Sequence, residues 1–250
     1  MRIRIATLAC ALALAACAHA HRHDGAPDSW PDPHPHELYG MLLFDQLEYA
    51  ASDGDDRLRW DLDGWIGGDD QRLVVKSEGE RNANGESDGD LELQLLYARP
   101  VTPFWDVELG VRQDVRYGAG ENQRRTSAVI GFEGIAPQWI DVEPMLFVSD
   151  EGDTYFRVEA THDLYVTQRI VAQSRVELEA AFSNDTRFGV RSGLNDLELG
   201  LRLRYEARRE LAPYLGITWT RKLGNTKDLA RRQGDEVDDF SLLLGLRFWF

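Results

Sequence analysis

Apolar and polar residues alternate along the chain, most clearly in its last eleven residues, Phe240 to Phe250. In this segment the apolar set takes every second position: Phe240, Leu242, Leu244, Leu246, Phe248 and Phe250. The positions between them hold a mixed set, namely Ser241, Leu243, Gly245, Arg247 and Trp249. Successive side chains of a β-strand point to opposite faces of the sheet. The pattern therefore predicts a terminal strand with one continuous apolar face.

Comparable segments of about ten residues recur from residue 39 onward, the length expected of strands that cross a membrane. Their apolar residues lie two apart, as in Leu197, Leu199, Leu201 and Leu203, whereas an amphipathic helix would space them three and four apart. The predicted strands cover residues 39–50, 58–67, 71–82, 90–99, 104–115, 124–134, 139–149, 154–165, 169–182, 194–206, 213–223 and 239–250.

The second face of these strands is charged, as at Glu198, Arg202 and Arg204. A soluble β-sandwich is one fold with such strands, but an uncovered apolar terminal strand would promote aggregation there. A closed membrane barrel removes the free edge and turns the apolar face to lipid. The terminal Phe250 and the alternation before it also resemble the C-terminal assembly signal of outer-membrane barrels. We therefore predict an all-β fold, an antiparallel transmembrane β-barrel of about 12 strands.

Side chains that face the lumen of the barrel are predicted to contact water. On that basis replacing Arg202 with glutamine should be mild. A charged residue in place of Leu201 should instead be costly, because that position would face hydrocarbon.

The connections between predicted strands alternate between short and long. The longer ones are rich in Gly, Asn and Asp and cover residues 51–57, 83–89, 116–123, 183–193 and 224–238, and the short turn at Glu151 is the exception. Short periplasmic turns and long extracellular loops are typical of outer-membrane barrels. Aromatic residues follow three of the short turns and are expected at the lipid–water interface, namely Phe104, Trp105, Trp139 and Tyr214. Pro144 has no N–H for the strand ladder, so a bulge is expected there.

The start of the chain is typical of a secretory signal peptide, residues 1–20. Its apolar run, Ile5 to Ala16, is too short to span a membrane. Cleavage after Ala20 would leave His21 first, whereas a lipobox-like sequence would instead leave a lipidated Cys17. The first site is favoured, because a barrel is already anchored and gains little from a lipid. Proline-rich residues 21–37 then form a short disordered periplasmic arm, and residues 38–250 form the barrel.

The formal charge of −15 becomes −17 once Arg2 and Arg4 leave with the signal peptide. This charge argues against nucleic acid as a partner and suits a surface that attracts cations. Both cysteines, Cys10 and Cys17, lie in the leader. Cleavage after Ala20 would therefore exclude disulfides and thiolate metal sites.

Histidines are concentrated in the arm, where His21, His23, His34 and His36 survive cleavage after Ala20. Imidazole together with a carboxylate such as Asp24, or with backbone nitrogen, suits tetragonal Cu(II). In a mature chain that begins His21-Arg22-His23, the amine, two amides and the His23 imidazole can surround one Cu(II). A plain soluble linker is the alternative for a histidine-rich tract.

From Gly40 onward the chain resembles the copper resistance protein B family of outer-membrane proteins. The segments that carry the resemblance are GMLLFDQLEY (40–49), WDLDGWIGGDDQRLVVKSEGE (60–80), PFWDVELGVRQD (103–114), SGLNDLELGLRLRYEARRELAPY (192–214) and TKDLARRQGDEVDD (226–239). The resemblance implies a role in copper tolerance, with metal bound by an N-terminal segment. Family members often carry a Met- and His-rich arm, but this arm contains no Met. Cu(II) is therefore favoured over Cu(I) as the bound ion.

Two further sets of residues are candidate sites. The predicted lumen and loop carboxylates could pass or hold cations, but they more simply interlock with Arg112, Arg157, Arg175 and Arg202; they comprise Asp61, Asp63, Glu78, Glu80, Glu92, Asp106, Glu108, Asp141 and Glu143. His162 and Ser192 could form a hydrolase pair, but no G-x-S-x-G sequence accompanies them.

The sequence therefore predicts a non-enzymatic copper-handling protein in the outer membrane of a Gram-negative bacterium, which sequesters or exports excess copper. Its expected partners are copper ions, outer-membrane lipid and periplasmic copper-handling proteins. The alternative is a narrow diffusion channel for small cations or other solutes.

Overall fold

The computed structural model describes residues 38–250, apart from positions 53, 85–87, 119–121, 186 and 235. The chain divides into two units, Met1–Leu38 and Tyr39–Phe250. The signal peptide, both cleavage alternatives and the arm lie outside the described residues, and so do its candidate ligands His21, His23, Asp24, His34 and His36. These remain predictions, and the structure below is that of the second unit.

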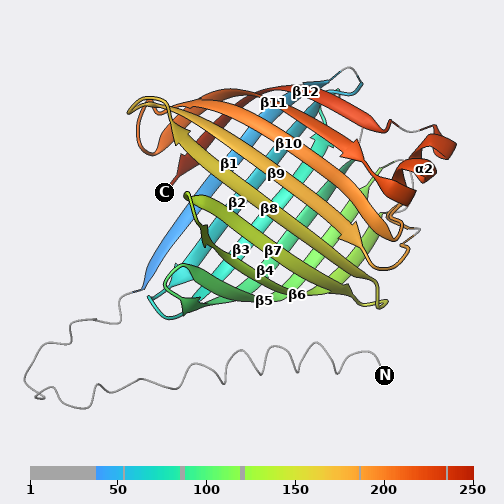
Figure 1. Cartoon of the computed structure of the whole chain (residues 1–250), viewed down its shortest axis with the longest axis horizontal. Helices are drawn as coiled ribbons and strands as arrows, with labels where there is room; N and C mark the ends of the chain where they lie inside the picture. Colours follow the sequence, from blue (N-terminus) through green and yellow to red (C-terminus); the bar gives the residue numbers. More distant parts are fainter. Residues whose placement is uncertain (1–37, 53, 85–87, 119–121, 186, 235) are drawn as a thin grey trace, which may run out of the picture. The chain divides into compact units, whose positions relative to one another are not determined.

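Twelve antiparallel strands form a closed barrel in which each strand pairs with its neighbours in sequence and the first pairs with the last (Figure 1). The strands are β1 (Tyr39–Ser52), β2 (Arg57–Gly67), β3 (Arg72–Asn82), β4 (Gly89–Thr102), β5 (Trp105–Tyr117), β6 (Gln123–Ala136), β7 (Ile140–Ser149), β8 (Thr154–Tyr165), β9 (Ile170–Ala181), β10 (Gly193–Tyr205), β11 (Leu211–Lys222) and β12 (Asp238–Trp249). The predicted fold class and strand number are confirmed.

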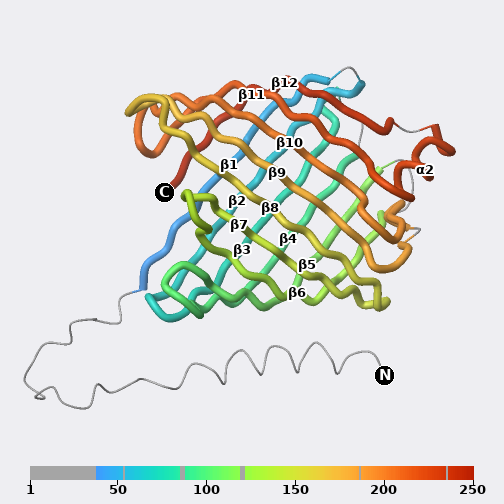
Figure 2. Tube along the Cα trace, in the orientation of Figure 1, coloured from blue at the N-terminus to red at the C-terminus, as the bar shows by residue number. Residues whose placement is uncertain are grey.

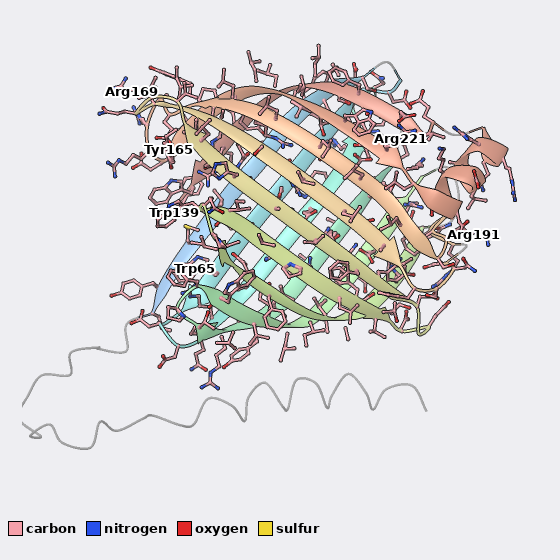
Figure 3. The ribbon with its side chains drawn as sticks, viewed as in Figure 1. Trp65, Trp139, Tyr165, Arg169, Arg191 and Arg221 are labelled. Carbon is pink, nitrogen blue, oxygen red and sulfur yellow. The ribbon has the colours of Figure 1, made fainter. Side chains whose placement is uncertain are left out.

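The two ends of the barrel differ in their connections. The turns at 68–71, 103–104, 137–139 and 166–169 lie at the end where β1 begins, which we call the short-turn end. The opposite, long-loop end carries most of the longer connections, including residues 182–192 and 223–237. Labelled side chains mark both ends in Figure 3, with Trp65, Trp139 and Tyr165 at the first and Arg191 and Arg221 at the second.

Side chains alternate between the outer and inner faces as the period-two pattern predicts. In β10, Leu201 and Leu203 are 50% and 54% exposed on the outside, while Arg202 and Arg204 are buried on the inside. In β12, Leu242 and Leu244 point outward and the intervening Leu243 is buried. None of the helices in the described part of the chain is long and apolar enough to cross a membrane.

The terminal strand β12 closes the barrel against β1, and Figure 2 shows the red β12 beside the blue β1 at this seam. The rings of Phe44 and Phe248 stack with centroids 4.5 Å apart. The register then shifts between Phe44 and Leu47. Within this shift Asp45 accepts a hydrogen bond of 2.6 Å from Arg247 Nε. The closed seam leaves no strand edge free to pair with another chain.

The structure places a helix where the sequence indicated only a loop. Helix α2 (Gly224–Gln233) lies within the connection between β11 and β12, and its Thr226 and Ala230 are buried. It ends at Gly234, whose φ of 84° is the left-handed conformation that favours glycine at a helix C-terminus. The helix was missed because its sequence is short and polar and no side chain caps its N-terminus.

The aromatic prediction is confirmed in part. Phe104 and Trp139 are 63% and 77% exposed at the short-turn end, as side chains of an interfacial belt should be. Tyr214 instead points into the barrel and is 3% exposed, so its predicted interfacial position is wrong. The reason is Gly245 on the paired strand β12, where an added Cβ would lie 2.4 Å from the Tyr214 ring. The absent side chain leaves the inward space that the ring fills.

The bulge expected at Pro144 is also wrong. The pairing of β7 with β6 and with β8 shows no shift in register at this proline. The β6 ladder is instead interrupted, since pairs form at Gly131–Met145 and Gly134–Val142 but not between them. The missing N–H is accommodated by omitting these pairs, not by inserting a residue.

Candidate functional site

The candidate site is the charged interior of the barrel, where ion pairs join strands that are not neighbours. Arg202 on β10 donates to Glu48 on β1 from Nε (3.1 Å) and Nη2 (3.0 Å). Its Nη2 also donates to Gln46 Oε1 at 2.7 Å, and the Tyr214 hydroxyl donates to Glu48 at 2.9 Å. All four side chains belong to residues at most 4% exposed. At this level the interior is packed, and the prediction that Arg202 faces water is wrong.

A second group joins β8 to β3, β4 and β5. Arg157 donates to Glu92 Oε1 at 2.9 Å and to Glu78 Oε2 at 3.3 Å. Arg112 contacts the same Glu92 at 2.7 Å and donates to Asp114 at 2.7 Å. These fork-shaped guanidinium contacts fix several carboxylates at once. The predicted interlocking of lumen carboxylates with Arg112 and Arg157 is therefore confirmed.

Arg175 on β9 organises a third group. Its Nη2 donates to Glu159 at 2.6 Å and to Glu177 at 3.0 Å, and its Nη1 lies 3.7 Å from Asp61 on β2. Arg175 is buried, so these contacts hold β2, β8 and β9 together through the interior. Ionised side chains at such positions are retained only when paired.

The short-turn half of the interior is dominated by one lysine that sequence reasoning did not single out. Lys76 Nζ lies 2.8 Å from Glu143, 3.1 Å from Glu133 and 3.4 Å from Glu108. Lys76 lies two residues after the inward-facing Val74 on β3 and so shares its face, which was a readable signal for its direction. Its three carboxylate partners come from β5, β6 and β7, and no local pattern could have assigned them.

The long-loop half contains a cavity of about 590 Å³. Side chains of both charge signs line it, among them Glu179, Asp196 and Lys222. Thr226 and Ala230 of α2 form part of its wall. The cavity is a polar space that could hold water or small ions. The ion-paired groups described above lie between it and the short-turn end.

A short hairpin, closed by backbone hydrogen bonds between Asp185 and Val190, covers one side of this cavity; we call it the cap hairpin. The guanidinium of Arg125 lies between the rings of Tyr155 and Phe188, 4.2 Å and 4.3 Å from their centroids. Asp185 accepts hydrogen bonds from Tyr155 at 2.8 Å and from Arg125 at 3.4 Å. These contacts dock the hairpin onto the inner wall.

The Asp185 carboxylate is the anchor of the cap hairpin. Burial alone would raise its pKa, but hydrogen bonds from Tyr155 and from the Phe188 and Arg187 amides, with Arg125 nearby, hold the pKa below its usual value. The carboxylate is therefore ionised at neutral pH.

Among the described residues, no three or more His, Cys, Asp or Glu side chains are grouped to hold a metal ion. His162 contacts the Trp139 carbonyl at the short-turn end, with Nδ1 3.3 Å from the oxygen. Ser192 lies in the 182–192 connection at the long-loop end, where its backbone N–H donates to Asn184 Oδ1. The hydrolase alternative needed these two side chains together, and the fold separates them.

Comparison with known proteins gives the same assignment along the whole barrel. The family model described as copper resistance protein B precursor (CopB) matches residues 38–250. The chain belongs to the copper resistance protein B family. It is 41% identical over 217 residues to copper resistance protein B of Escherichia coli, covering 87% of this chain and 71% of that protein. A copper resistance protein B homolog of Pseudomonas syringae pv. tomato is 42% identical, with coverage of 87% and 72%.

Solved structures place this CopB-family chain among outer-membrane barrels. The NanC porin superposes with a TM-score of 0.55 at 14% identity, covering 83% of this chain and 98% of the porin. Outer membrane phospholipase A from Escherichia coli gives 0.50 at 12% identity, covering 86% and 93%. At these identities the likeness concerns the fold alone, and the fold is that of an outer-membrane β-barrel.

Proposed function

We propose that this CopB-family barrel handles copper at the outer membrane without catalysing a reaction, by binding excess copper ions for sequestration or export. The observation that carries the proposal is the family match over residues 38–250, which includes every strand of the barrel. The strongly acidic chain, with a formal charge of −15, favours cations over anions as its cargo.

The arm would supply the first copper ligands. It is covalently joined to β1, which begins at Tyr39 at the short-turn end. In outer-membrane barrels short turns face the periplasm. Copper delivered by periplasmic copper-handling proteins would therefore meet the arm in the periplasm, while outer-membrane lipid surrounds the apolar belt.

The chemistry of the arm favours Cu(II). The free amine of His21, the amides of Arg22 and His23 and the His23 imidazole supply four nitrogens in a plane. Asp24 offers a neighbouring carboxylate, and His34 and His36 can complete this site or bind a second ion. Each of these nitrogen donors must lose a proton before it binds, so affinity falls as pH falls. The imidazole part of that loss is expected near pH ~6.5.

An arm variant tests this site directly. An alanine inserted before His21 moves the third-position imidazole and should abolish the square-planar Cu(II) spectrum of the purified mature protein. His34→Ala with His36→Ala is the matched control and should leave that spectrum in place. Electron paramagnetic resonance and N-terminal sequencing are the measurements. An unchanged spectrum after the insertion, or a mature chain that starts at a lipidated Cys17, rules the amino-terminal site out.

Deleting the gene separates copper handling from the diffusion-channel alternative. Loss of a copper-handling protein should lower the copper concentration at which growth stops, whereas loss of a plain channel should alter solute uptake without copper sensitivity. The packed layer around Arg202 and Glu48 favours the first outcome, because an open pore would need water there. Normal copper tolerance in the deletion strain would contradict the proposed function.

A further inference from the structure

The group around Lys76 has more negative than positive charge. Three carboxylates, Glu108, Glu133 and Glu143, contact the single ammonium. A fourth, Asp63, lies directly opposite Lys76 in the β2–β3 pairing. When all are ionised, four negative charges face one positive charge. The Lys76 and Glu108 side chains are only 6% and 1% exposed, so water screens little of the charge at these two groups, whereas Glu133 is 55% exposed.

Such an excess of buried charge requires a partner. Burying unpaired carboxylates is costly unless they are neutralised by protons or by bound cations. The arginine-centred groups described above hold their carboxylates with fork-shaped guanidiniums that offer several donors. An ammonium offers only three donors and a single compact charge. The Lys76 group therefore differs from those groups in being centred on an ammonium.

A second observation points to the same place. Glu108 Oε2 and Asp63 Oδ1 are buried and accept no hydrogen bond within the described part of the chain. The nearest cation to Glu108 Oε2 is Lys76 Nζ at 3.4 Å, which is longer than a normal charge-assisted hydrogen bond. Ten other buried side-chain atoms in the described part of the chain also lack a partner. These two oxygens are relevant because both belong to the Lys76 group, and an ion or water is one common explanation for such atoms.

We propose that the Lys76 group is a cation-exchange site in which a small divalent cation displaces the Lys76 ammonium from Asp63, Glu108, Glu133 and Glu143. A purely carboxylate donor set suits hard cations such as Mg²⁺, Ca²⁺ or Mn²⁺. Among the described residues no group of carboxylates is arranged as a ready-made cage, and Lys76 Nζ lies 2.8 Å from Glu143 in the space that the ion would take. Glu133, 55% exposed, gives the ion a route from solvent, and the flexible lysine stem allows the ammonium to withdraw.

This site uses none of the arm's residues and differs from the proposed copper site in ligand type and metal preference, so it stands or falls apart from the proposed copper function. Mn²⁺ is the probe, and its free concentration is measured by electron paramagnetic resonance in the full-length mature protein. The four arm histidines are replaced by alanine so that only the barrel is measured. Lys76→Met removes the competing charge and should tighten Mn²⁺ binding roughly tenfold or more, because a charge within about 4 Å acts strongly inside a protein.

Lys222→Met is the matched control. Lys222 lies at the long-loop end and bonds to the Glu236 carbonyl, so its loss also removes one positive charge from the chain. Equal tightening in both variants would mean general attraction to an acidic protein and would overturn the site. Glu133→Gln, at a largely exposed side chain, keeps the test valid if Lys76→Met fails to fold. It should weaken Mn²⁺ binding to the otherwise unchanged barrel, and unchanged binding would show that protons neutralise the group.

Discussion

Replacing Arg202 with glutamine is expected to lower the free energy of unfolding by roughly 3–5 kcal/mol, the range found when one partner of a buried ion pair is removed. Arg202 is 1% exposed and donates to both oxygens of Glu48. Without it, Glu48 would keep the hydrogen bond from Tyr214 and a distant Arg59, whose Nη1 is 3.9 Å away. A buried carboxylate would then lack its main counter-charge.

The measurement is urea unfolding of the barrel in lipid vesicles, followed by heat-modifiable gel mobility. Arg169→Gln is the control, because Arg169 is exposed on a short turn, and a surface change there should stay within about 0.5 kcal/mol. Adding Glu48→Gln to Arg202→Gln should restore part of the lost stability, since no unpaired charge remains. A single Arg202→Gln variant as stable as the wild type would contradict the packed interior.

The neighbouring Leu201 is also expected to be intolerant of substitution, but because it faces lipid and not the packed interior. Leu201 is 50% exposed on the outer face, where hydrocarbon replaces water, and Leu201→Arg should cost about 2–4 kcal/mol near the midplane. Along β10, two adjacent positions that face opposite sides of the sheet are therefore both intolerant of substitution. Hydrophobic periodicity alone identified Leu201 but not Arg202.

Local sequence pattern predicts the direction of a side chain but not its partners. Period-two alternation is a property of neighbouring residues, so it predicted the strands, their facing and, through the short and long connections, the closed barrel. The partners of inward side chains are set by closure, as when Glu48 and Arg202, 154 positions apart, meet across the interior. The alternation therefore predicted that these two side chains point inward, but not which residues they contact. For the same reason the sequence predicted a water-filled interior around Arg202, where the structure is packed.

Tertiary context also decided the elements that were missed. Helix α2 has too few apolar residues to show a helical period, and it is held by Thr226 and Ala230, which are buried beside the barrel wall. Tyr214 was assigned to the interface from its position after Pro213, yet its ring packs inside the barrel in the space that Gly245, which has no side chain, leaves open. The copper ligands of the arm were proposed from residue type and spacing, which need no fold, and they lie outside the described residues.

Releasing the cap hairpin is the second large effect that we expect. Asp185→Ala removes the carboxylate that accepts from Tyr155, Arg125 and the amides of Arg187 and Phe188. Buried charge-assisted hydrogen bonds contribute about 1.5–3 kcal/mol each, so trypsin cleavage after Arg187 should become at least roughly tenfold faster. The rest of the barrel should keep its heat-modifiable mobility, because the strands do not depend on this hairpin.

A matched control is an exposed ion pair between the same hairpin and the turn that joins β7 to β8. Glu151 pairs with Arg187 at 2.8 Å, but both side chains are exposed, 56% and 39% respectively, and such pairs contribute little to stability. Glu151→Gln should therefore leave the cleavage rate nearly unchanged. Arg125→Ala should match Asp185→Ala, because it removes the cation that lies between the Tyr155 and Phe188 rings.

The pH dependence follows from the lowered pKa of Asp185. A carboxyl whose folded-state pKa is depressed stabilises the folded form fully above its ordinary value, here 3.8, and loses that contribution as pH falls through the lowered pKa. Docking of the wild-type hairpin should thus be constant between about pH 8 and pH 6, after correction for the activity of trypsin. Cleavage that accelerates steeply toward pH 6, or an Asp185→Ala variant cut no faster than Glu151→Gln, would show that this carboxylate does not anchor the hairpin.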